Sequence, residues 1–408
     1  MQAAGLRIAM ISFHTSPLDQ PGIGDAGGLN VYLRGLASAL ADEGAEVTIF
    51  TRAAAQRRRQ AVLDPPPRIR VAEVPLGQSG DPAREHLTAM LPDFTTAVGT
   101  MARGEYFDII HSHYWLSGLV GRTLAADWSV PLVHTMHTVA RMKDLNLAPG
   151  EVPEPPERIA AEQELATTSD ALIASTDQEA RALVELCSAP PERVHVVAPG
   201  VDLDTFHPGD KIAARRELGV PLDTPLLLFV GRIQPLKSPD VIIRALHLLR
   251  TSGGPQPRLV VLGGPSGSPD HLTHVAELAT ELGVADQVVR RDPVPPAELA
   301  RWYRAADAVT MPSRSETFGF VAAEAQASGT PVLAAEVGGL SEVIADGVSG
   351  ILIPGHEPQQ WAAAISRILT DSAERERLAA GARRRRGTFA WPTAAGGTLA
   401  AYRAAVAS

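Results

Sequence analysis

The chain has 408 residues, 45% of them hydrophobic and 20% charged, which is ordinary for a globular enzyme and long enough for two hydrophobic cores. Its formal net charge of −9 argues against broad binding of nucleic acid, so an anionic ligand has to be held by a local basic cluster. The single cysteine, Cys187, excludes an internal disulfide framework and is typical of a reducing, cytoplasmic compartment. No apolar stretch of roughly 18 residues predicts a membrane span, and the N-terminus is interpreted as a buried strand and not as a signal peptide.

Short apolar runs alternate with helical patterns along the whole chain, which predicts an α/β fold with parallel sheets covered by helices. The strands predicted in the first half are residues 7–12, 47–51, 69–74, 108–111, 131–135, 171–175 and 194–197. Those in the second half are 226–230, 259–262, 288–289, 308–311, 331–334 and 350–353. Residues 29–43 are predicted to form a helix, since Val31, Leu33, Leu36 and Leu40 recur at a helical period and Gly44 can end it.

A segment rich in turn residues, 198–208, separates the two series of strands and is suited to a hinge. We therefore predict an N-terminal domain over residues 1–200, a C-terminal domain over 201–389, and a final helix over 390–408 that packs back on the first domain. Both domains are expected to be doubly wound and Rossmann-like. Ligands of such domains bind at the carboxyl ends of the strands, so the site is expected in the cleft between the two domains.

Two glutamates follow the predicted strand 308–311. A helix beginning near Gly319 would direct its free N–H groups at the preceding loop and attract a phosphate. Glu316 lies on that loop and Glu324 inside the helix; eight helical residues span roughly 12 Å, about the reach of a nucleotide sugar from ribose to hexose. One carboxylate could accept ribose hydroxyls and the other sugar hydroxyls, while a surface glutamate plus a capping glutamate is the alternative.

A local basic cluster follows the predicted strand 226–230, where Arg232 and Lys237 lie in a strand-to-helix turn. Arginine can fork two phosphate oxygens, and lysine provides a mobile point charge. The cluster is therefore predicted to bind a diphosphate, with two solvated cations as the alternative. The glycine-rich segment 261–267 could line the same nucleotide pocket.

The loop after the first strand, residues 14–30, is rich in glycine and leads into a helix, so its backbone could approach a phosphate closely. Its spacing is not that of a dinucleotide-binding loop, and Arg52 stands where such a domain has an acidic residue. A flexible surface loop is the alternative. Asn30 could cap the helix or bind a sugar hydroxyl.

Histidines cluster after two further strands, in segments 111–115 and 134–138. Zinc is disfavoured because no acidic ligand lies nearby and both segments are strand ends. His137 and Thr138 are predicted to face a substrate, and His111 and His134 to be core residues. The basic runs 57–59 and 383–386 are interpreted as solvated faces, with weak attraction to anionic lipid as the alternative.

Segments 231–237 and 316–324 together resemble the retaining glycosyltransferases of the GT-B fold, in glycosyltransferase family 4, which includes sucrose-phosphate synthase and phosphatidylinositol mannosyltransferases. The resemblance covers nearly the whole chain. Segments 14–18, 24–32, 111–118 and 153–158 look more specifically like the inositol-phosphate N-acetylglucosaminyltransferases that open mycothiol biosynthesis in actinobacteria. In that family UDP-N-acetylglucosamine is the donor and 1D-myo-inositol 3-phosphate is the acceptor.

The resemblance implies roles for individual residues of this chain. It implies a catalytic set of His137, Arg232, Lys237 and Glu316. The implied donor-binding residues are Gly28, Arg232, Lys237, Val294, Glu316, Gly319, Phe320 and Glu324, with Glu324 on the ribose and Glu316 on the hexose. The implied acceptor-binding residues are His14, Asp25, Asn30, Arg84, Tyr114, Thr138 and Arg158. Arg84 is the nearest match to a lysine that the family has in this segment. The positive charge is therefore retained, but the length and shape of the side chain differ.

The resemblance also bears on cofactors and partners. No cofactor is expected for the chemistry, although relatives can carry a structural Mg²⁺ at main-chain oxygens that match Tyr303, Arg304 and Ala306. A cytoplasmic homodimer that binds no nucleic acid is implied. No carboxylate is placed convincingly as a nucleophile, so retention is expected through front-face attack, with His137 orienting the donor sugar.

Other functions remain open at the level of sequence. A phosphorylase would need a Schiff-base lysine, and the second half offers only Lys237, with Lys211 at its edge. An epimerase and a non-catalytic sensor of nucleotide sugars are further alternatives. Among transferases, the donor could carry glucose or another sugar, and the acceptor could be another cyclitol, a sugar phosphate or an aminocyclitol.

Overall fold

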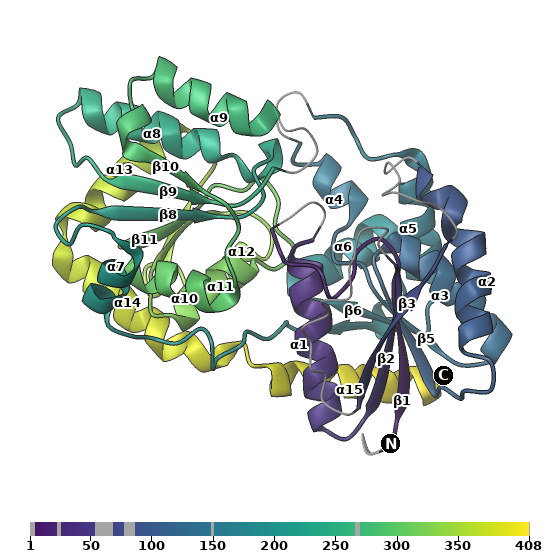
Figure 1. Ribbon diagram of the computed structural model, residues 1–408. Helices are drawn as coiled ribbons and strands as arrows, with labels where there is room; N and C mark the ends of the chain where they lie inside the picture. The colour runs from purple at the N-terminus through teal and green to yellow at the C-terminus, as the bar shows by residue number, and fades with distance from the viewer. Residues whose placement is uncertain are drawn as a thin grey trace.

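The computed structural model describes residues 5–22, 26–53, 68–76, 86–147, 151–265 and 270–407, which form two α/β domains (Figure 1). In the described part of the chain, seven parallel strands form the first sheet in the order β3-β2-β1-β4-β5-β6-β7. Their bounds are β1 (Arg7–Ser12), β2 (Glu46–Arg52), β3 (Ile69–Val74), β4 (Ile109–His113), β5 (Leu132–Thr135), β6 (Ala171–Ala174) and β7 (Val194–Val196).

Six parallel strands of the described chain form the second sheet, in the order β10-β9-β8-β11-β12-β13. These are β8 (Leu226–Val230), β9 (Arg258–Leu262), β10 (Val288–Arg291), β11 (Ala308–Met311), β12 (Val332–Ala335) and β13 (Gly350–Ile353). The strand order reverses direction between β1 and β4 in one sheet and between β8 and β11 in the other. Ligands of doubly wound sheets bind at these switch points, so both sheets direct a binding edge at the space between the domains.

Helices cover both faces of each sheet. Those of the first domain are α1 (Gly28–Asp42), α2 (Leu91–Met101), α3 (Trp115–Trp128), α4 (Ala140–Asp144), α5 (Pro156–Thr168) and α6 (Asp177–Cys187). Those that follow are α7 (Lys211–Leu218), α8 (Pro239–Thr251), α9 (Asp270–Glu281), α10 (Pro296–Ala305), α11 (Phe320–Ala327), α12 (Leu340–Val343), α13 (Pro358–Thr370), α14 (Ser372–Arg385) and α15 (Trp391–Ala407). Among the described residues, no helix is both long enough and apolar enough to cross a bilayer.

The strands form where the sequence places short apolar runs. In β1, with the sequence RIAMIS, all but the first residue are buried, as expected for a strand covered on both faces. Apolar side chains of α2, α3 and α5 pack on one face of the first sheet, and those of α1 and α15 pack on the other. All the predicted strands are present with ends shifted by two residues at most, which confirms the α/β, GT-B fold class.

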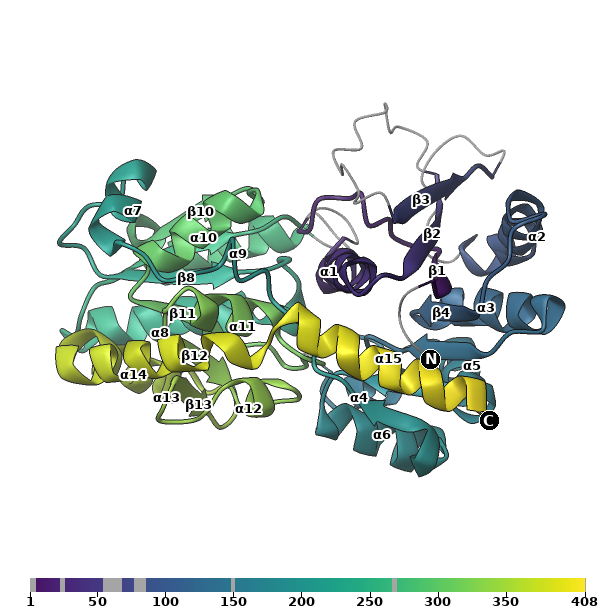
Figure 2. The same ribbon diagram turned by 90° about the horizontal axis from the view of Figure 1, so that it is seen from below.

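The chain crosses between the domains twice. The first crossing follows β7 and the second follows α14, and they run side by side, since Val201 N donates to Phe389 O at 3.2 Å and Val201 bridges Ala390. After the second crossing, α15 runs beneath the first domain (Figure 2). There Leu399 and Tyr402 join the apolar cluster of α1 and β1. Gly35 of α1 makes room for the contact, because a Cβ at this position would lie 2.0 Å from the Trp391 ring.

Candidate active site

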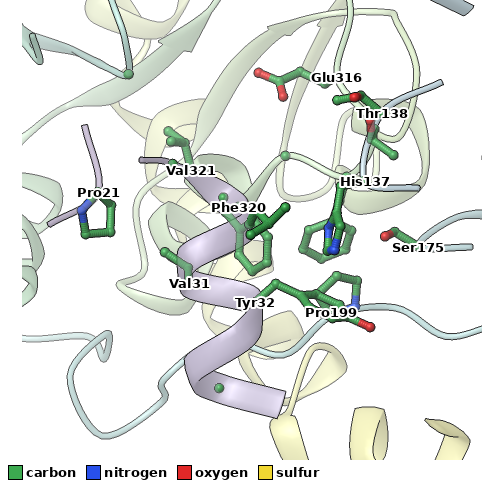
Figure 3. A pocket seen from close by; sticks show the side chains of 18 of the residues that line it. Pro21, Val31, Tyr32, His137, Thr138, Ser175, Pro199, Glu316, Phe320 and Val321 are labelled. Atoms are coloured by element: carbon green, nitrogen blue, oxygen red, sulfur yellow. The ribbon is translucent and has the colours of Figure 1, made fainter. Parts of the chain in front are cut away.

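A cleft of about 1490 Å³ lies between the two domains and is lined by residues of both (Figure 3). The structure brings most of the predicted site residues to its wall. Those lining it are His14, Gly28, Tyr114, His137, Thr138, Arg158, Arg232, Lys237, Val294, Glu316, Gly319, Phe320 and Glu324. Most of them follow β1, β4 and β5 in one sheet and β8 and β11 in the other, which are the strands at and beside the two switch points. Val294 follows the edge strand β10, and Arg158 lies within α5.

Lys237, in the segment that follows β8, forms an ion pair with Glu316, in the segment that follows β11. Lys237 ends the short 3-10 helix Pro235–Lys237, and Ser313 Oγ donates a second hydrogen bond to the same Glu316 oxygen at 3.0 Å. Both side chains are largely buried but line the cleft. At this part of the cleft wall a cation and a carboxylate therefore neutralise each other.

The loop that carries Glu316 is held in place by two glycines. Gly338 has a φ of +52°, and a Cβ there would lie 1.9 Å from the Glu316 carbonyl oxygen. The amide of Gly339 donates to the same carbonyl at 2.9 Å. Glycine is thus required at position 338 both by its backbone angle and by the close approach of the Glu316 backbone.

Glu324 is a buried carboxyl group at the wall of the cleft. It lies in the first turns of α11, whose N-cap Gly319 has a φ of 100°, and it accepts a hydrogen bond of 2.8 Å from Tyr303 Oη of α10. Burial raises the pKa of Glu324 to about 7; the bond from Tyr303 opposes the rise, and the charge of Asp202 adds to it. This carboxyl group therefore changes its charge close to neutral pH.

Arg232 extends toward the opposite wall of the cleft. Its Nε lies 3.9 Å from the position that a Cβ on Gly27 would occupy, just before the start of α1. Gly28, the first residue of α1, approaches the Phe320 ring so closely that a Cβ would lie 3.1 Å from it. A guanidinium group of the second domain and a helix start of the first thus converge on one point, a combination that favours an anion.

His137 lies at the carboxyl end of β5 in a left-handed backbone conformation, with a φ of 61°. Its Nε2 is 3.1 Å from Nδ1 of His113, so one of these rings donates a hydrogen bond to the other. Burial, together with the neighbouring histidines, holds the pKa of His137 and of His113 well below the ordinary value. Both rings are therefore neutral at neutral pH. The strained backbone costs energy and persists at this position because packing enforces it.

His111 and His134 are core residues, as predicted. The two ring nitrogens of His111 pair with Tyr402 Oη at 2.8 Å and Thr135 Oγ1 at 2.9 Å. Those of His134 pair with Ser112 Oγ at 2.8 Å and Met136 Sδ at 3.2 Å. Burial lowers the pKa of each to about 3, so neither carries charge at neutral pH.

Arg158 lies on the first-domain wall with its guanidinium group fully engaged. Nε donates to Glu162 at 2.7 Å, Nη1 to Glu154 at 2.8 Å and Nη2 to Thr138 Oγ1 at 2.8 Å. The guanidinium carbon lies 5.0 Å from the centre of the Tyr114 ring, which stacks the cation on an aromatic face. Three of the predicted acceptor residues therefore form one contiguous group.

Asn30 is a predicted site residue that does not line the cleft. Asn30 is buried outside the cleft wall; its Oδ1 accepts from Gly27 N at 2.9 Å and its Nδ2 donates to Thr15 Oγ1 at 2.8 Å, which is the capping alternative. Asp25, Arg84 and the basic run 57–59 lie outside the described residues. Of the other basic run, Arg385 and Arg386 are half-buried and donate to Val343 O and Leu203 O at 3.4 and 2.5 Å.

The predicted Mg²⁺ position does not offer a free main-chain oxygen at Tyr303. Its carbonyl accepts from Thr330 Oγ1 at 2.7 Å and from Ala306 N at 3.2 Å, so both lone pairs are used. The Arg304 side chain packs against Gly209. Over the residues that the structure describes, no group of three His, Cys, Asp or Glu side chains has the arrangement of a metal site.

Two polar residues of the cleft wall, Lys143 and Glu154, were missed from the sequence. Lys143 lies on the short helix α4, and Glu154 lies in the segment before α5. Their side chains pair at 2.5 Å although they are 11 residues apart in the chain. Neither directly follows a strand, and the resemblance implies no role for either of them, although Glu154 lies in segment 153–158.

Two family models match the chain. The glycosyl transferase 4-like domain matches residues 27–200, and the glycosyl transferases group 1 model matches residues 210–385. A curated protein named D-inositol 3-phosphate glycosyltransferase, from Xylanimonas cellulosilytica, is 51% identical over 407 residues, which cover 98% of this chain and 96% of its own. A protein of the same name from Thermobispora bispora is 50% identical over 396 residues, covering 95% and 92%.

Solved structures agree with these matches. Sucrose-phosphate synthase from Thermosynechococcus elongatus has a TM-score of 0.89 at 31% identity, over 98% of both chains. HepE of Anabaena, solved with UDP-glucose, has a TM-score of 0.78 at 21% identity, over 97% of this chain and 99% of its own, and it shows the fold alone. The chain is therefore a GT-B glycosyltransferase and belongs to the D-inositol 3-phosphate glycosyltransferase family.

Proposed function

We propose that this protein transfers N-acetylglucosamine from UDP-N-acetylglucosamine to 1D-myo-inositol 3-phosphate with retention, the first step of mycothiol biosynthesis. The observation that carries the proposal is the placement of two cationic groups on opposite walls of one cleft. Arg232 and Lys237 lie on the second-domain wall, and Arg158 lies on the first-domain wall. One group suits the diphosphate of a nucleotide sugar and the other the phosphate of an acceptor.

The comparisons support the acceptor half of this proposal by name. The similar curated proteins are called D-inositol 3-phosphate glycosyltransferases, and they match along nearly the whole chain. HepE, which shares the fold, was solved with UDP-glucose, and we propose a nucleotide-sugar donor for this chain as well. N-Acetylglucosamine as the transferred sugar is proposed from the motif resemblance.

The donor would lie along the second domain. In this proposal Arg232 and Lys237 hold the diphosphate, Glu324 accepts ribose hydroxyls, and Glu316 accepts hydroxyls of the hexose. Lys237 would exchange its ion pair with Glu316 for the charged diphosphate, while Glu316 would accept hydrogen bonds from neutral hydroxyls of the hexose. As the bond to UDP breaks, negative charge grows on the leaving phosphate next to the two cations, which stabilises the transition state.

His137 fits the role of orienting the donor sugar. The pKa of His137 lies well below its ordinary value because of burial and neighbouring rings, and its ring contacts His113. A neutral ring can hydrogen-bond to a sugar hydroxyl, whereas the depressed pKa makes it a poor proton acceptor. The acceptor proton is therefore proposed to pass to the leaving phosphate, while the protein positions the two substrates.

Release of UDP from purified protein tests the proposal. Mixing UDP-N-acetylglucosamine with 1D-myo-inositol 3-phosphate should release UDP in proportion to acceptor, and the product should show α configuration by NMR. UDP-glucose and unphosphorylated inositol are the matched substrates that test donor and acceptor choice. Faster turnover with UDP-glucose would contradict the donor, and turnover that does not depend on the acceptor phosphate would contradict the acceptor. A pyridoxal chromophore in the purified protein would favour a phosphorylase instead.

A further inference from the structure

A bridge of alternating charges lies on the first-domain wall of the cleft. Glu154 Oε1 accepts from Lys143 Nζ at 2.5 Å, and Glu154 Oε2 accepts from Arg158 Nη1 at 2.8 Å. All three side chains line the cleft. One carboxylate thus occupies the space between two cations from different helices, with one oxygen on each of them.

The two carboxylates that contact Arg158 differ in position. Glu162 is almost fully buried, lies outside the cleft lining, and also accepts the Ala140 amide at 2.7 Å, which ties it to the start of α4. Glu154 lies on the cleft side, and 13% of its side chain is exposed. Glu162 therefore holds Arg158 in place, whereas Glu154 covers the surface of Arg158 that faces the cleft.

The backbone of Glu154 is held independently of its side chain. Its amide donates to Asp144 Oδ1 at 2.8 Å, so the segment stays attached to α4 when the side chain changes rotamer. The positive neighbours keep the carboxylate ionised: burial would raise the pKa of Glu154, but Arg158 and Lys143 outweigh burial and hold the pKa below its ordinary value. The carboxylate is therefore a permanent anion on a side chain that can rotate.

We propose that Lys143 is a second cation of the acceptor-phosphate site and that Glu154 is an internal competitor for that site. The inference rests on the proposed function and adds to it how the site would select an acceptor that carries a phosphate. Two oxygens of a phosphate monoester can replace the two oxygens of Glu154 on Lys143 and Arg158, while Thr138 Oγ1, which already accepts from Arg158, supplies a neighbouring hydroxyl. Lys143 and Arg158 come from the separate helices α4 and α5, so the phosphate would join them as Glu154 does.

The competition gives selectivity for dianions. A neutral cyclitol cannot compensate the two cations, so Glu154 stays on them and occupies the space. A phosphate monoester carries more charge and more acceptor oxygens than a carboxylate, so it can displace Glu154. Discrimination of this kind disfavours the wrong ligand as well as favouring the right one.

Two variants with opposite expected effects test the proposal. Lys143→Met keeps an unbranched side chain one atom shorter than that of lysine and removes its charge, and it should raise KM for inositol phosphate about 10-fold or more. Glu154→Gln removes the competing charge and should lower that KM by about threefold or more. KM for the nucleotide sugar should stay unchanged in both. Glu157→Gln is the matched control, because Glu157 lines the same wall on α5 but is exposed and outside the bridge; it should change neither KM.

Calorimetric titration with inorganic phosphate provides a readout that needs no turnover. Lys143→Met should weaken phosphate binding and Glu154→Gln should strengthen it, relative to the wild type. If the wild type turns over inositol phosphate and both variants leave KM and phosphate binding unchanged, the inference is wrong and the proposed function stands. If the wild type turns over no polyol phosphate, the proposed function is wrong, and the calorimetric pair alone decides whether Lys143 and Glu154 share an anion site. Thermal unfolding of each variant confirms that it is folded.

Discussion

At the residue scale, the buried Glu324 and Tyr303 are joined by a hydrogen bond between two helices. The bond gives the buried Glu324 carboxyl group a partner at the cleft wall. Lys237 and Glu316 pair with each other at the same wall. These polar groups therefore have partners within the protein, which avoids the large cost of burying them unpaired.

Donor affinity should depend on pH through Glu324. Burial raises the pKa of this group to about 7, and only the ionised form can accept hydrogen bonds at both oxygens. We expect KM for the donor to fall several-fold as the pH rises from about 6 to about 8, and Glu324→Gln to flatten this profile. Because the folded-state pKa lies above the ordinary value of 4.5, the free energy of unfolding should decrease as the pH rises from about 4.5 to about 7. A pH-dependent donor KM in the Gln variant would contradict the assignment.

Lys237→Ala should lower kcat about 100-fold or more while leaving the fold intact. The variant removes a cation next to the charge that develops on UDP, and it leaves Glu316 facing the same phosphate without compensation. Steady-state kinetics and the thermal midpoint measure the two effects separately. Arg244→Ala is the control, since Arg244 is a partly exposed cation on α8 outside the cleft lining. A kcat near that of the wild type in Lys237→Ala would remove the proposed diphosphate site.

At the element scale, the strands could be predicted because a parallel strand that is buried on both faces has a short run of apolar residues. The order of the strands within each sheet was not predicted. The start of α11 could be predicted as well, because Gly319 directly precedes Phe320 and can adopt the left-handed backbone. Residues placed after strands were found by the same logic. The cleft wall contains them because a doubly wound sheet gathers its strand ends at one edge.

Pairings between distant side chains could not be predicted. Lys237 and Glu316 are 79 residues apart, and nothing in the local sequence of either reports that they meet. Lys143 and Glu154 are closer in the chain, but they lie on a short helix and in an irregular segment. Neither segment has a hydrophobic periodicity from which their relative positions could be predicted. The sequence allowed two roles for Asn30, capping a helix or binding a sugar hydroxyl. Only the direction of its side chain in the structure distinguishes the two.

Activity should depend on the turn at Gly338, because this turn positions the loop that carries Glu316. In Gly338→Ala the new Cβ meets the Glu316 carbonyl, so the loop has to shift, and we expect a loss of about 1–3 kcal/mol in stability and a clear drop in kcat/KM. Gly347→Ala is the matched control, because Gly347 also has a positive φ, of 65°, but a Cβ there meets nothing within 4 Å. The control should lose stability through its backbone and keep full activity. Equal loss of activity in both variants would show that Gly338 acts through stability alone.

At the scale of the whole molecule, Glu342 fastens one domain to the other. Its two oxygens accept the amides of Asp177 and Gln178 at 2.9 and 2.8 Å, so a carboxylate of α12 caps the N-terminus of α6. Thr176 Oγ1 donates to Thr317 O beside it at 3.3 Å. These contacts join the loop of Glu316 to the first domain, so we expect the position of Glu316 to depend on how closely the two domains approach.

Glu342→Ala should shift the protein toward a more open arrangement. The lost cap leaves two helix amides without this partner and removes an attraction that exists only when the domains are close. We expect a larger radius of gyration in small-angle X-ray scattering and a several-fold higher KM for both substrates. Glu357→Ala, a change of an exposed glutamate in the same domain, is the control. An unchanged radius would mean that other interdomain contacts determine the closed form.

The return of α15 to the first domain has a consequence for synthesis. Tyr32 and Gly35 of α1 pack against Trp391 at the start of α15, and apolar side chains of α15 share one cluster with those of α1. Helix α15 comprises the last 17 described residues, which leave the ribosome only after the entire second domain. The domain that is translated first is thus completed last. Until α15 is in place, the apolar surface that it covers stays exposed and can aggregate or bind chaperones. A chain that lacks this one helix would carry an intact second domain beside an incomplete first domain, so truncation is expected to yield insoluble product.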